Sequence, residues 1–135
     1  MGNYFQPEIE CASPEQIRAW QDERLMHTVR HVYDNVAYYR NLMKERGVEP
    51  GDIKSVDDLY KLPFLTKDDL RDAYPYGLLA VPLRDTVRIQ STSGTTGRRV
   101  VAFYTQHDID LWDDCCARAI VAAGGTKDDV VHVCY

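Results

Sequence analysis

Basic charge, paired cysteines and long apolar runs are all scarce in this sequence. With 21 acidic against 16 basic side chains and a formal net charge of -5, the chain lacks the general electrostatic attraction on which nucleic-acid binding depends. No apolar run approaches the length of a membrane span, and "MGNYFQPEIE" at the N-terminus has neither the basic region nor the apolar core of an export signal. We therefore expect no nucleic-acid partner, no membrane partner and a cytoplasmic location.

Cysteine is present but never in a C-x-x-C pair. The four residues are Cys11, Cys115, Cys116 and Cys134. This spacing favours reduced thiols over a zinc site or a disulfide framework. Cys115 and Cys116 fall in a helical pattern where neighbouring side chains diverge, so we expect at least one of them to be a small buried residue.

The histidines do not form a recognisable metal or nucleophile site. His27 and His31 are four residues apart, which places both imidazoles on one face of a helix. Without a third ligand nearby, a surface or core pair is a better interpretation than a metal site. His107 and His132 are isolated in the sequence, so a nucleophile paired with a histidine base has no visible second member.

The first half of the sequence is helical. Ser13, Pro14 and Gln16 form a start signal, a capping box with proline at the first helical position. Gly47 is a plausible end after "AYYRNLMKER". Apolar residues that step by four, three and four predict one buried stripe: Leu25, Val29, Val32 and Val36. Two further capping patterns precede the short helices "VDDLYKL" and "KDDLRDAY": Ser55 with Asp58 and Thr66 with Asp69. The acidic residues in these first turns are explained by the helix dipole, without a catalytic role.

The second half reads as strands and a helix. "TVRIQ" and "VVAFYT" predict two strands, and Thr105 with Asp108 caps a helix that ends at Gly124 and Gly125. The closing "DVVHVCY" predicts an apolar strand of the kind buried in an α/β sheet. Because an apolar terminal strand needs a partner, we expect either the front of a longer protein or pairing in a dimer. A homodimer is also compatible with the long amphipathic N-terminal helix.

The loop between the two strands carries the chemistry. "STSGTTGRRV", residues 91–100, places five hydroxyl side chains and two glycines in its first seven positions and then adds two arginines. Hydroxyls, accessible backbone N–H groups and guanidinium groups together suit a phosphate. Only Thr95 and Thr96 separate Gly94 from Gly97, so the loop is neither a Walker loop nor a Rossmann fingerprint. The alternative is a solvated hairpin tip without a ligand.

Larger segments of the sequence resemble a known family. "TSGTTGRR" is similar to the phosphate-binding loop of the adenylate-forming acyl-CoA ligases, and the surrounding text resembles their phenylacetate-CoA ligase branch. The similar segments cover essentially the whole chain: "QDERLMHTVRHVYDNVAYYRNLMKERGV", "IKSVDDLYKLPFLTKDDLRDAYPYGLLAVP", "VRIQSTSGTTG" and "YTQHDIDLW". Two positions depart from the family pattern, since Arg98-Arg99 replaces the usual Lys-Pro and Gln90 replaces the usual histidine.

The resemblance implies an α/β fold and a two-step reaction. A carboxylate such as phenylacetate attacks ATP to give an acyl-adenylate and pyrophosphate, and coenzyme A then displaces AMP. The loop residues implied to hold the β- and γ-phosphates, with the cationic role passing to the first arginine, are Thr92, Ser93, Gly94, Thr95, Thr96, Gly97 and Arg98. No metal ligand is assigned to this chain, because the family's acidic residue for Mg²⁺ and its other later motifs have no counterpart before Tyr135.

The resemblance also implies a division of the chain. Residues 1–85 form a helical N-terminal segment, and residues 86–135 begin the α/β adenylate-forming domain, with one incomplete domain overall. The piece alone is expected to be inactive because it lacks the adenine pocket. Two alternatives stay open: a free-standing nucleotide-binding or phosphate-binding module without catalysis, and a helical interaction domain whose loop binds nothing.

Overall fold

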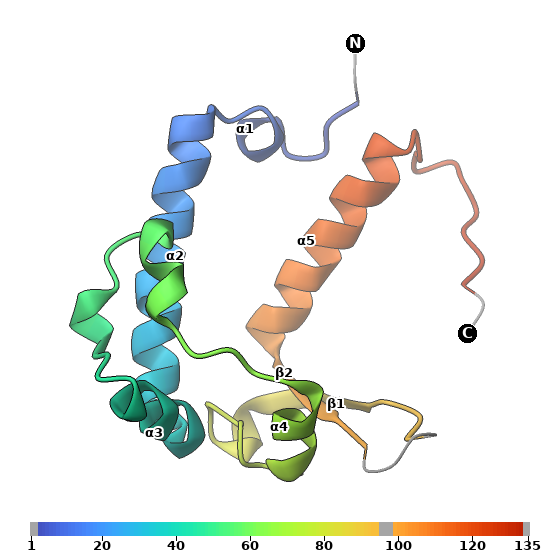
Figure 1. Cartoon of the computed structure of the whole chain (residues 1–135). Helices are drawn as coiled ribbons and strands as arrows, with labels where there is room; N and C mark the ends of the chain where they lie inside the picture. Colours follow the sequence, from blue (N-terminus) through green and yellow to red (C-terminus); the bar gives the residue numbers. More distant parts are fainter. Residues whose placement is uncertain (1–2, 95–98, 134–135) are drawn as a thin grey trace.

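The computed structural model of the chain describes residues 3–94 and 99–133. Helices precede and follow a two-stranded sheet, and the predicted α/β class is confirmed. The elements in chain order are α1 (Pro7–Glu10), α2 (Pro14–Asn35), α3 (Ala37–Glu45), η1 (Pro50–Asp52), η2 (Val56–Lys61), α4 (Lys67–Asp72), η3 (Leu83–Asp85), β1 (Thr86–Ser91), β2 (Val101–Thr105) and α5 (Gln106–Ala122). In Figure 1, α2 stands at the left and α5 to its right, and the two strands lie below the lower end of α5.

The long N-terminal helix begins and ends where local chemistry requires it. Ser13 caps α2 by accepting the backbone N–H three residues further on, at 3.2 Å. The helix ends because Val36 is extended, with φ -117° and ψ 104°. Arg40 on α3 donates from one guanidinium nitrogen to the carbonyl oxygens of Tyr33 and Asp34, at 3.0 and 3.1 Å. These two carbonyls belong to the last turn of α2, so the arginine holds the bend between the two helices.

The core of the helical half lies between α2, α3 and the end of η1. Val29, Met43 and Ile53 are 3%, 1% and 2% exposed and pack together. Half-buried apolar side chains surround them: Leu25, Tyr33, Val48 and Leu62. The predicted stripe of α2 is confirmed, because Val29 and Val36 are buried and its other two members are half-buried. Gly47, at φ +67°, follows α3 as the predicted end of the helix.

Three of the four predicted capping boxes are present in the structure, whereas at Ser13 only the bond from the Gln16 backbone N–H to the hydroxyl is formed. In each of the three, the hydroxyl side chain accepts a backbone N–H while the aspartate three residues later accepts the backbone N–H of the cap residue. The pairs are Ser55 with Asp58 on η2, Thr66 with Asp69 on α4, and Thr105 with Asp108 on α5. The element after Ser55 is a 3₁₀ helix, not an α-helix.

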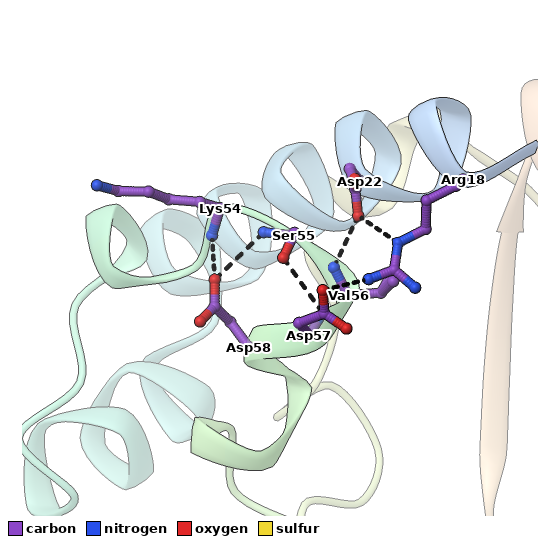
Figure 2. A network of polar contacts seen from close by, with 7 residues as sticks. All are labelled: Arg18, Asp22, Lys54, Ser55, Val56, Asp57 and Asp58. Carbon is purple, nitrogen blue, oxygen red and sulfur yellow. Dashed lines mark hydrogen bonds and ion pairs between the residues drawn. The ribbon is translucent and has the colours of Figure 1, made fainter. Parts of the chain in front are cut away.

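A polar network joins η2 to α2 (Figure 2). The carboxylate of Asp22 on α2 accepts the backbone N–H of Val56 at 2.8 Å. Arg18, one turn earlier, lies 3.4 Å from Asp22 and 2.7 Å from the carboxylate of Asp57. The first residue of η2 is thus bonded to a helix 34 positions away in sequence.

The strands form an antiparallel hairpin that leads directly into α5. Thr86 pairs with Thr105 and Ser91 pairs with Val101, and an irregularity follows Thr86. These strands match the predicted ones at 86–90 and 100–105. Ile109 on α5 is 9% exposed and belongs to the buried apolar residues, whereas most of the remaining helix surface is open.

Two expectations for the last third of the chain are wrong. The predicted strand "DVVHVCY" does not form over residues 129–133, and its last two residues, Cys134 and Tyr135, lie outside the described residues. Val130, Val131 and Val133 are 98%, 65% and 69% exposed. A strand exists only when its backbone is paired, and no described strand lies beside this segment. Cys115 and Cys116 are both exposed, contrary to the expectation that at least one is buried. Helical spacing identified their positions on α5, but nothing in the described residues covers them.

Candidate functional site

The predicted phosphate-binding loop begins where the β1–β2 ladder ends. Beyond the Ser91–Val101 pair, the backbone N–H of Thr92 donates to the carbonyl oxygen of Val100 at 3.0 Å. The N–H of Val100 in turn donates to the hydroxyl oxygen of Thr92 at 3.1 Å. The Thr92 side chain therefore closes the neck of the loop, and its hydroxyl hydrogen stays available for a ligand.

The described part of the loop is open to solvent. Thr92, Ser93 and Arg99 are exposed, and Gly94 has φ +73°, a backbone conformation that favours glycine. Hydrogen-bond donors in the described part of the loop are thus accessible to an anion. The other predicted site residues lie outside the described residues: Thr95, Thr96, Gly97 and Arg98.

A groove of about 1150 Å³ lies beside the exit of the loop. Its walls come from α2, α4, the segment 75–81, β2 and the start of α5, and Val100 is the loop residue that reaches it. Thr92, Ser93 and Gly94 do not line it. Six titratable or charged side chains do: Glu23, Arg24, His27, His31, His107 and Asp108.

The groove brings together histidines that are separate in the sequence. The rings of His27 and His31 are stacked, with centroids 6.0 Å apart, and His107 lines the same groove from the start of α5. Sequence reasoning identified the pair on α2 but treated His107 as isolated. Among residues 3–94 and 99–133, no group of three histidine, cysteine, aspartate or glutamate side chains is arranged to hold a metal ion.

A second, aromatic pocket of about 490 Å³ lies on β2 and α5. Its lining residues are Phe103, Tyr104, Asp108, Leu111, Trp112 and Cys115. The rings of Tyr104 and Trp112 are 5.5 Å apart, and the guanidinium of Arg88 lies 6.0 Å from the Trp112 ring. Residue spacing predicted the two strands and the helix, but not that β2 and α5 together form a pocket.

The acidic residues of the helix starts are structural. The ammonium of Lys61 and the backbone N–H groups of Lys54 and Ser55 lower the pKa of Asp58 to about 2. The Thr66 hydroxyl, together with the Tyr38 phenol, lowers the pKa of Asp69 to about 2. Both carboxylates are therefore ionised at neutral pH and accept hydrogen bonds within their capping boxes. This supports the prediction that they have a structural role and no catalytic one.

The chain is similar to known proteins in both its sequence and its fold. No family model matches the chain. The chain is 50% identical over 127 residues to the phenylacetate-coenzyme A ligase of Aromatoleum evansii and 47% identical to that of Escherichia coli (strain K12), with 94% of the chain aligned in both cases. A solved 2-hydroxyisobutyryl-CoA ligase, in complex with 2-HIB-AMP and CoA, superposes on 87% of the chain and 26% of its own chain, with a TM-score of 0.78 and 26% identity.

The structural match identifies the class of protein to which the chain is similar. The chain has the fold of part of an adenylate-forming CoA ligase. Within that class it is a relative of the phenylacetate-CoA ligases, and the resemblance predicted from the sequence is confirmed. The chain spans about 29% of the length of the curated relatives that it matches. No helix in the described part of the chain is long and apolar enough to cross a membrane.

Proposed function

We propose that this chain is part of an ATP-dependent aryl-CoA ligase that converts phenylacetate or a related aryl-acetate to its CoA thioester. The observation that carries the proposal is 50% identity over 94% of the chain to a phenylacetate-coenzyme A ligase. The exposed hydroxyl groups at the neck of the loop support it, because they offer hydrogen-bond donors to an anion. Since the ligase proposed here uses ATP and coenzyme A, the proposal includes a cytoplasmic location.

The proposed reaction has two steps. In the first, a carboxylate oxygen of the aryl-acetate forms a bond to the α-phosphorus of ATP, and the bond to the bridging oxygen of pyrophosphate breaks. In the second, the thiol of coenzyme A attacks the acyl carbon of the adenylate, loses its proton and displaces AMP. The pyrophosphate leaving group gains charge as the first step proceeds, so donors fixed around its oxygens lower the barrier.

Seven residues of the loop are proposed to supply those donors: Thr92, Ser93, Gly94, Thr95, Thr96, Gly97 and Arg98. The geometry of the first three fits an anion. Thr92 is held by its two bonds to Val100, Ser93 is exposed, and Gly94 allows close approach to the backbone. Mg²⁺ would neutralise phosphate charge in this reaction, and we propose that residues outside this chain hold it.

The experiment uses the protein as isolated from its source cells. Its intact mass is measured first, and AMP release is then assayed with ATP, coenzyme A and a series of aryl-acetates. We expect a chain several times heavier than these 135 residues and AMP release that requires the acid. A ligase-length protein without acid-dependent AMP release would refute the proposal, and a native chain of this length would favour the free-standing module.

A matched pair of variants tests the loop itself. Thr92→Val removes the hydroxyl, whereas Thr92→Ser keeps both the oxygen that accepts from Val100 and the hydrogen available to phosphate. Loss of a hydrogen bond to a charged group costs about 1.5–3 kcal/mol, so we expect the Val variant to lower kcat/KM for ATP by roughly 10–150-fold. The Ser variant should retain most activity. Equal activity in both variants would remove Thr92 from the site.

A further inference from the structure

Three side chains from three elements meet where the hairpin lies against α5. Arg88 pairs with Tyr104 across the β1–β2 ladder, so the two side chains lie next to each other on one face of the hairpin. The rings of Tyr104 and Trp112 are 5.5 Å apart, with 40° between their planes, and the guanidinium of Arg88 lies 6.0 Å from the centre of the Trp112 ring. A cation in this position is attracted by the quadrupole of the indole. We call these three residues the Arg88 cluster, which connects β1, β2 and α5.

The place of Arg88 in β1 gives its contact a particular effect. The ladder is irregular between Thr86 and Arg88, and Val87 at this irregularity is 58% exposed. An irregularity of this kind interrupts pairing locally and allows the strand to bend. Arg88 is the first residue of the regular ladder beyond it, so its contact with Trp112 fixes the direction in which β1 continues.

The two strands of the hairpin reach α5 by different routes. β2 continues directly into the helix through its cap, Thr105, whereas β1 is preceded by η3 and contacts α5 through Arg88. Beyond Arg88 the ladder runs without interruption to the neck of the loop, where Thr92 bonds to Val100. The intervening pairs are Ile89 with Phe103, Gln90 with Ala102, and Ser91 with Val101. The direction of β1 therefore determines where Thr92 lies relative to Val100.

We propose that Arg88 is a positioning residue for the phosphate-binding loop and that it acts through Trp112. The proposal rests on the proposed function, since it takes Thr92 and Ser93 as donors to the phosphates of ATP. A direct contact between Arg88 and ATP phosphate fits the geometry less well. Thr92 lies four residues further along the chain, roughly 13 Å of extended strand, and the guanidinium is placed at the Trp112 ring.

Hydrogen exchange at the neck tests this role without any use of ligase activity. The amide exchange of the full-length protein is followed by mass spectrometry in peptides that contain Thr92 or Val100, whose backbone N–H groups close the neck. We expect Arg88→Met to increase their exchange roughly 2–5-fold, the factor that corresponds to a cation–π contact at an exposed site. Peptides from α2 should be unchanged. Unchanged exchange at the neck, or an equal increase in α2, would overturn the proposal.

Steady-state kinetics of the full-length protein shows whether Arg88 acts through Trp112. We expect Arg88→Met and Trp112→Leu each to raise KM for ATP roughly 2–5-fold, and the double variant to raise it no further. Trp112→Phe keeps a ring and should have a smaller effect. A variant that is merely less stable has a lower kcat with an unchanged KM, because its remaining folded molecules bind ATP normally. If Arg88→Met has its full effect in the Trp112→Leu background, Arg88 acts by another route and the proposal fails.

A second arginine provides a matched control for the loss of charge. Arg84 lies in η3, just before β1, and its side chain is 85% exposed. Arg84→Met removes the same charge and should leave KM for ATP unchanged. An equal rise in both variants would indicate a long-range effect of charge and overturn the proposal. Missing AMP release in the wild-type protein would instead refute the proposed function, and the exchange of the neck would still decide whether Arg88 positions the loop.

Discussion

Removing the Asp22 carboxylate should weaken the attachment of η2 to α2. The contacts of that carboxylate allow the resulting loss of stability to be estimated. Asp22 accepts the part-buried N–H of Val56 at 2.8 Å (Figure 2). A donor left without a partner in such a position costs about 1–3 kcal/mol. The ion pair with Arg18 is longer, at 3.4 Å, and Arg18 is 43% exposed, so solvent weakens it. We therefore expect Asp22→Ala to lower the free energy of unfolding by about 1–3 kcal/mol.

The Asp22→Asn variant separates the hydrogen bond from the charge. The amide oxygen of asparagine still accepts from Val56, so its loss of stability should be less than half that of Asp22→Ala. Urea unfolding followed by circular dichroism gives both values, and the midpoint should fall without a change in the m-value. Equal losses in the two variants would show that charge, not the bond to Val56, is responsible. No loss in either would mean that this contact does not hold η2 in place.

Three further predictions concern other parts of the chain. Tyr38 donates to Asp69 at 2.5 Å, which with burial raises the pKa of Tyr38 to about 12. Its contribution to stability should be complete below the ordinary tyrosine pKa and lost as pH rises towards 12. In urea unfolding measured across this range, Tyr38→Phe should make the decline less steep. Met43→Ala should lower the free energy of unfolding by about 2–5 kcal/mol, because Met43 is 1% exposed, and a loss below about 1 kcal/mol would contradict its place in the core. In the ligase-length protein, Arg98→Ala should weaken ATP affinity more than Arg99→Ala in calorimetric titrations, and equal, negligible losses would count against the loop assignment.

Features that depend on neighbours in sequence were predictable. A capping box needs a hydroxyl residue and an aspartate three positions later, so Thr66 with Asp69 can be identified without knowledge of the fold. The stripe containing Val29 and Val36 is equally local, because helical period alone determines which side chains share a face. The resemblance to a known family also predicted the ligase class, which helical period and residue spacing could not indicate.

Features that depend on distant segments were not predictable. The bond from Val56 to Asp22 joins residues 34 positions apart, and no residue pattern indicates it. The expectation that at least one of Cys115 and Cys116 is buried was wrong, because a helix position becomes buried only when another element covers it. The participation of His107 in a groove with α2 likewise depends on where the hairpin places the start of α5.

The direct passage from β2 into α5 has a mechanical consequence. Thr105 is both the last residue of the strand, paired with Thr86, and the cap of the helix, with bonds of 2.8 and 3.3 Å to Asp108 and no linker between the elements. A rotation of α5 must therefore break the cap or turn β2 with it. Val100, the residue just before β2, bonds to Thr92 at the neck of the loop, so β2 connects the neck directly to α5. Displacement of the helix would therefore change the neck of the loop, where we propose that a phosphate binds.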